Sequence, residues 1–97
     1  MQDLRSASVM LLNIIQSNSI MKDEFDIFVN AVGKKIKHLR KLRGLSQEDM
    51  EKNDGVPLRT IQNIETGKSI ATLKSIFRIA KRLKVHPKEL VDVKWKR

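Results

Sequence analysis

The stretch SQEDMEKNDGVPLRTIQNIETGK, residues 46–68, decides how the chain folds. Ser46 is a preferred helix N-cap, because its hydroxyl can accept a hydrogen bond from an amide of the first turn. Asp49, three residues later, fits a reciprocal capping box. Gly55 can adopt the left-handed conformation that ends a helix in a sharp turn. These signals predict a first helix over residues 46–54, followed by a tight turn.

A second helix is predicted over residues 58–66, and Gly67 can end it in the same way. Ile61 and Ile64 share one face and are expected to be buried. The opposite face carries Arg59, Gln62, Asn63 and Thr66. A cation, amides and a hydroxyl are the groups that hydrogen-bond to base edges and phosphates. Taken alone, the pattern fits a DNA-reading surface and an ordinary solvated helix face equally well.

A long helix is predicted before this motif, over residues 23–43, and Gly44 can close it. Its apolar stripe has helical spacing and consists of Phe25, Phe28, Val32, Ile36 and Leu39. Gly33 lies inside the helix and weakens it by roughly 1 kcal/mol relative to Ala. We interpret Gly33 as a joint between an acidic extension and a basic domain.

Two further helices are predicted after the motif. Thr72 caps the first of them, and its expected buried stripe is Leu73, Ile76, Phe77, Ala80 and Leu83. Pro87 stands at the first position of a short fifth helix over residues 86–90. The basic tail, 92–97, alternates apolar and polar residues, which fits either a strand or a frayed end. The expected fold is therefore all-α, with five helices and short turns.

Residues 1–29 are interpreted as an N-terminal extension and residues 30–91 as the folded domain. The apolar run within residues 9–15 fits a helix or a buried strand, since periodicity does not separate the two here. It is far shorter than the roughly 20 residues that a membrane span needs. It also lacks the features of a signal peptide. We expect it to pack on the domain or on a second subunit.

Charge is unevenly distributed along the chain, whose net charge is +9. Residues 1–30 carry two basic and four acidic side chains, whereas residues 31–97 carry eighteen and seven. Such a basic excess favours a polyanionic partner, most simply nucleic acid, although many soluble proteins carry surface lysines. The chain has no cysteine, which is compatible with a cytoplasmic location.

The two histidines, His38 and His86, have no nucleophile or metal-ligand partner at a telling spacing, and no glycine-rich phosphate loop is present. We therefore expect no enzymatic activity, no metal site and no cofactor.

The motif region contains residues 45–50, Gly55-Val56, Thr60-Ile61, Ile64-Glu65 and Gly67-Lys68. Together these residues resemble the helix-turn-helix of lambda-repressor/Cro-type (XRE family) DNA-binding domains. The resemblance covers roughly residues 30–91. It implies that Leu58, Arg59, Gln62 and Asn63 face the bases and that Ser46, Gln47, Thr60, Lys68 and Arg43 face phosphates. It also implies a partly buried ion pair between Arg40 and Glu65. Leu58 could contact a thymine methyl or fold back onto the core.

Three residues depart from the family pattern. Glu51 stands where a small residue is usual, Asp54 where an apolar or small one is common, and Pro57 where a hydrogen-bonding N-cap is usual. These departures predict a loosely packed first helix and leave open how the recognition helix is presented.

The resemblance implies a transcriptional regulator that binds double-stranded DNA as a homodimer, with helix 58–66 in the major groove. Its operator would be two-fold symmetric, with half-sites about 34 Å apart. The simplest version is a repressor that has its own gene among its candidate targets. The alternative is the antitoxin of a toxin–antitoxin pair, with residues 9–15 or 91–97 binding the toxin protein.

Overall fold

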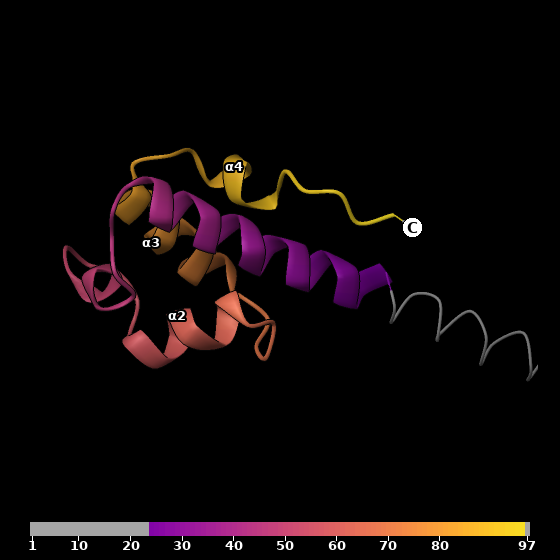
Figure 1. Ribbon diagram of the computed structural model, residues 1–97, viewed down its shortest axis with the longest axis horizontal. Helices are drawn as coiled ribbons and strands as arrows, with labels where there is room; N and C mark the ends of the chain where they lie inside the picture. Colours follow the sequence, from indigo (N-terminus) through magenta and orange to yellow (C-terminus); the bar gives the residue numbers. More distant parts are fainter. Residues whose placement is uncertain (1–23, 97) are drawn as a thin grey trace, which may run out of the picture.

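The computed structural model describes residues 24–96, which form helices joined by turns, with no strand among them (Figure 1). The expected all-α fold is confirmed. In chain order the elements are a long helix over residues 24–42, the 3-10 helix η1 (Glu48–Glu51), and the α-helices α2 (Leu58–Glu65), α3 (Leu73–Leu83) and α4 (Pro87–Val91). The expectations for residues 1–20 lie outside the described part of the chain.

One hydrophobic core joins the helices. Its buried side chains are Val32, Ile36, Met50, Val56, Ile61, Ile64, Ile76, Ile79, Ala80, Leu83 and Leu90. Two of these residues, Val32 and Ile36, come from the stripe predicted for the long helix. Phe28 and Leu39 of the same stripe are half-buried and pack against the core. Phe25 departs from the prediction, because its side chain is largely exposed.

The long helix crosses α2 at Gly33, which is buried. A Cβ atom at this position would collide with the backbone carbonyl of Ile64. The interpretation of Gly33 as a joint is therefore wrong, because the helix is continuous through it. The glycine instead lets two helices approach closely. Gly44 ends the helix with a φ of 67°, as expected.

The predicted first helix of the motif, 46–54, is wrong as an α-helix. Only η1 forms there. The backbone is already extended at Lys52, and Asn53 and Asp54 then adopt left-handed conformations with φ of 55° and 61°. Asn and Asp tolerate that region better than most residues. Gly55 does not take the left-handed conformation expected of it. It is needed for space instead, since a Cβ atom there would collide with the Met50 carbonyl oxygen.

The buried face of α3 also differs from the prediction. Thr72 caps the helix as expected, because its side chain accepts a hydrogen bond from the Ser75 amide. Leu73 and Phe77, expected in the core, are exposed, and Ile79 is buried in their place. The apolar residues of α3 cover a wide arc, so that two overlapping stripes were available, and packing against the other helices selects one.

α4 and the tail complete the fold. Pro87 occupies the first helical position, as predicted, and the preceding His86 accepts a hydrogen bond from the Lys88 amide. α4 lies on the opposite side of the long helix from α2 (Figure 1). Residues 92–96 form no strand, and Val93 packs against the core. Within residues 24–96, no helix is long and apolar enough to cross a membrane.

Candidate nucleic-acid interface

α2 presents the polar face that the sequence predicted. Ile61 and Ile64 are buried, whereas Arg59 and Gln62 are exposed and Asn63 is half-buried. The helix thus offers a guanidinium and two amides on a side that is free of the core. Thr60 is half-buried on the same helix.

The start of α2 is capped by a residue that sequence reasoning missed. Pro57 provides no side-chain cap. Instead, the Glu51 carboxylate of η1 accepts a hydrogen bond from the Leu58 amide. A carboxylate at a helix N-terminus also interacts favourably with the helix dipole. The available signal was the pair of departures itself, an acid at position 51 and a proline at 57. Leu58 is half-buried against the core, which is the second of its two expected placements.

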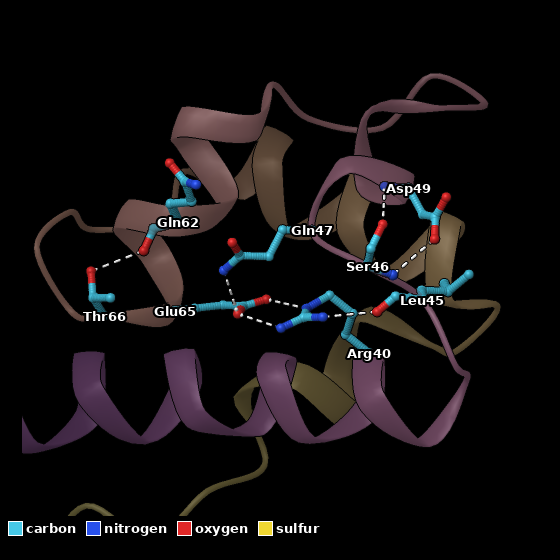
Figure 2. Close-up of polar contacts among 8 residues, drawn as sticks. All are labelled: Arg40, Leu45, Ser46, Gln47, Asp49, Gln62, Glu65 and Thr66. Carbon is cyan, nitrogen blue, oxygen red and sulfur yellow. Dashed lines mark hydrogen bonds and ion pairs between the residues drawn. The ribbon is translucent and has the colours of Figure 1, made fainter.

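The end of α2 is a tight turn. Gly67 has the predicted left-handed conformation, with φ of 76°. The amides of Lys68 and Ser69 both donate to the Asn63 carbonyl, at 2.9 and 3.2 Å. The Thr66 hydroxyl donates to the Gln62 carbonyl at 2.9 Å, so this side chain is engaged within the helix (Figure 2). The Lys68 side chain is exposed directly after the turn.

A buried ion pair holds α2 against the long helix. Arg40 donates from Nε to one Glu65 carboxylate oxygen at 2.7 Å and from Nη2 to the other at 3.0 Å (Figure 2). Both residues are buried, with 7% and 8% of their surface exposed. The hydrogen bond to Glu65 is the main cause that raises the pKa of Arg40. Arg40 also donates to the Leu45 carbonyl at 2.8 Å, which fixes the chain after the helix.

Gln47 extends this ion pair to a third segment. Its side-chain Nε2 donates to Glu65 at 3.1 Å (Figure 2). A side-chain amide has two hydrogens, so the second remains available to a further acceptor. The long helix, the start of η1 and the end of α2 are thereby joined through one carboxylate. The position of Gln47 is thus set by the same network that sets the position of α2.

The capping box before η1 is formed in both directions. The Asp49 amide donates to the Ser46 hydroxyl at 3.1 Å, and the Ser46 amide donates to the Asp49 carboxylate at 2.8 Å (Figure 2). Hydrogen bonding from the Ser46 amide, from Lys52 and from the Ser46 hydroxyl lowers the Asp49 pKa from 3.8 to about 2.

Arg43 lies in a different setting. It lines a hollow of about 150 Å³ with Leu45, Leu83, Arg82 and Lys84, where the long helix and α3 end. Arg82 has a structural role, because its Nε donates to the Asp49 carbonyl at 2.9 Å and so holds η1 to α3. The structure thus brings most of the predicted residues to α2, its following turn and the start of η1. It groups Arg43 with other cations.

Three comparisons bear on this geometry. The helix-turn-helix family model matches residues 36–90, which is over half of the chain. An uncharacterized HTH-type transcriptional regulator of Methanocaldococcus jannaschii is 49% identical over 47 residues, covering 48% of this chain and 71% of that protein. The crystal structure of the restriction-modification controller protein C.AhdI from Aeromonas hydrophila superposes with a TM-score of 0.61. It shares 29% sequence identity, over 64% of this chain and 94% of that one.

Proposed function

The chain belongs to the XRE-type helix-turn-helix family and is a transcriptional regulator with a DNA-binding domain, and from this premise we propose that it reads a specific double-stranded sequence as a homodimer. The proposal is carried by the exposed polar face of α2, held at a fixed orientation by the buried pair of Arg40 and Glu65. A rigid support is what a base-reading helix needs, because a small displacement misaligns its hydrogen bonds.

In this proposal α2 enters the major groove, which admits an α-helix. Arg59 can bind the O6 and N7 atoms of guanine with two hydrogen bonds, and Gln62 or Asn63 can bind the N6 and N7 atoms of adenine. Because Leu58 is only half-buried, its exposed edge can also meet a thymine methyl at the start of the helix.

Phosphates would be held around this helix. Lys68, exposed after the turn, supplies a cation, and the Gln47 side chain keeps one amide hydrogen for donation. Ser46 lies directly before Gln47 and is exposed. Thr60 and Arg43 complete the proposed phosphate contacts. Such contacts fix the position of the protein on the duplex, while the α2 side chains read sequence.

A homodimer would bind a two-fold operator with half-sites about 34 Å apart. We further infer that the protein acts by occupying a promoter, as a repressor that can include its own gene among its targets. Control would then follow from protein concentration and from dimerisation.

The direct test is selection of duplexes from a random library by the purified full-length protein at near-physiological salt. We expect a two-fold symmetric consensus. A set of bound duplexes without a consensus, held only by salt-sensitive binding, would contradict unaided base reading and point to a protein partner.

The role of Arg59 is tested by Arg59→Ala. We expect a loss of about 1–3 kcal/mol in binding free energy and relaxed preference at one base pair of each half-site, because one bidentate contact is removed. Arg78→Ala is the matched control, since Arg78 is an equally charged, exposed residue on α3. The orientation of α2 assigned here is wrong if Arg59→Ala leaves the selected consensus unchanged.

A further inference from the structure

An apolar groove of about 340 Å³ lies on the described domain. It is formed by the first half of the long helix, the end of α2, the segment leading into α3, the first turn of α3, and the end of α4. Its principal apolar lining residues are Phe25, Phe28, Val32, Ile70, Leu73 and Val91. Ser69 is the one polar residue among the described residues that line it.

The groove leaves large apolar side chains in contact with water. Leu73 is 89% exposed and Ile70 is 64% exposed, and Phe25 and Val91 are also exposed. Single exposed apolar residues are normal, whereas a contiguous group around a groove marks an interaction site. The fold itself does not explain this group, because the core beneath it is complete without these four side chains.

The chain contains a segment of matching chemistry close by in sequence. Residues 9–15 read Val-Met-Leu-Leu-Asn-Ile-Ile, with one polar residue in seven. The described part begins at Glu24, which lines a neighbouring hollow with Phe25, Phe28 and Trp95. The chain therefore arrives at the edge of the groove. Residues 16–23 connect the two parts and can span roughly 28 Å when extended, at about 3.5 Å per residue.

Charge does not oppose this occupant. Residues 9–15 carry no charged side chain. The segment can therefore enter an apolar groove without burying an unpaired charge.

We propose that residues 9–15 of a second copy of this chain occupy the groove, and that the exchange is reciprocal. The inference rests on the homodimer proposed above. A segment that docks in the groove of its own chain covers apolar surface but does not link two copies of the protein. A reciprocal exchange uses both grooves and both segments. It thereby brings the buried area toward the roughly 1,200–2,000 Å² typical of stable interfaces.

Engineered disulfides distinguish the two arrangements, and the absence of native cysteine makes the experiment clean. Leu73→Cys is combined in turn with Leu11→Cys, Leu12→Cys and Ile14→Cys in the full-length protein under mild oxidation. We expect at least one pair to give a covalent dimer. A covalently closed monomer would show that the segment fills its own groove, and no disulfide from any pair would show that it is elsewhere. Either result overturns the inference.

A charge placed in the groove provides a second test. Leu73→Lys is expected to raise the dimer dissociation constant at least about tenfold, equivalent to 1.4 kcal/mol, by sedimentation. Leu42→Lys is the matched control, because Leu42 is 67% exposed but does not line the groove. An unchanged dissociation constant for Leu73→Lys contradicts the inference. Leu73 is too exposed for its replacement to unfold the domain, and circular dichroism checks this.

DNA binding is measured in parallel, so that the two proposals fail separately. Sequence-specific binding by a protein that forms no exchanged disulfide refutes the exchange and leaves the regulator intact. A covalently exchanged dimer without base preference refutes the proposed DNA reading and leaves the interface intact.

Discussion

At the scale of single residues, the carboxylate of Glu65 has the most partners. It accepts hydrogen bonds from Arg40 and from Gln47, and so joins three segments of the fold. The net stabilisation from a buried ion pair is small when compared with well-packed apolar residues, because both charges lose their hydration. The loss of one partner is different, since it leaves the other charge buried and uncompensated.

Arg40→Met is therefore expected to lower the free energy of unfolding by about 3–5 kcal/mol, measured by urea denaturation. Arg78→Met removes the same charge from an exposed position and should change it by less than about 0.5 kcal/mol. The double variant Arg40→Met/Glu65→Met should be less destabilised than the sum of the single variants, because no charge is left unpaired. Strict additivity of the two single effects would contradict the coupling.

The lowered pKa of Asp49 predicts how the stability of the protein changes at acidic pH. Its pKa is lowered from 3.8 to about 2 in the folded protein, so the unfolded chain binds the proton more tightly. The stabilisation by this carboxylate is then present above about pH 4 and is lost as pH falls from about 4 to 2. Thermal melting over this interval should show a smaller pH dependence in Asp49→Asn than in the native protein. Parallel pH profiles would contradict the assignment.

At the scale of elements, the ends of the helices were predictable from sequence, because a cap depends on a few neighbouring residues. Gly44, Gly67, Thr72 and Pro87 all stand where the sequence analysis placed them. The capping box of Ser46 was equally local, although it opens a 3-10 helix rather than the expected α-helix.

Local sequence patterns did not predict the contacts between distant segments. The Arg40–Glu65 ion pair was expected only because the family resemblance implied it. The buried side of α3 was decided by packing, which placed Ile79 inside and left Phe77 outside. Among the candidate site residues, the exposed face of α2 followed from periodicity. The cap from Glu51 did not, because it spans seven residues and joins two elements.

Gly33 shows how contact between elements can outweigh helix propensity. Gly33→Ala should stabilise an isolated helix by about 1 kcal/mol. In the folded protein we expect it to lower stability by about 1–3 kcal/mol, because the new methyl group would overlap the Ile64 carbonyl. Thermal melting decides between these signs. Lys34→Ala, at the adjacent exposed position, is the control and should change little. A raised melting temperature for Gly33→Ala would show that the helices separate readily.

At the scale of the whole molecule, the charge distribution governs how strongly salt affects the proposed DNA binding. The logarithm of the affinity should fall linearly with the logarithm of salt concentration, as counterions are released from DNA. Lys68→Ala should reduce this slope by about 0.9, since it removes one phosphate contact and no base contact. Lys88→Ala removes an equally exposed charge from α4, on the other side of the long helix, and should leave the slope unchanged (Figure 1). Equal effects of both variants would mean that net charge alone attracts the DNA.

The carboxylate that caps α2 has a consequence for protein engineering. In the proposal above α2 is the helix that reads DNA, so a graft meant to transfer its specificity to another domain would move residues 58–65. Such a graft would not include the carboxylate that accepts a hydrogen bond from the Leu58 amide, because Glu51 belongs to η1. Pro57 provides no side-chain cap in its place. A transplant from this protein must therefore carry residue 51 as well, or introduce Ser or Asp at position 57 of the recipient.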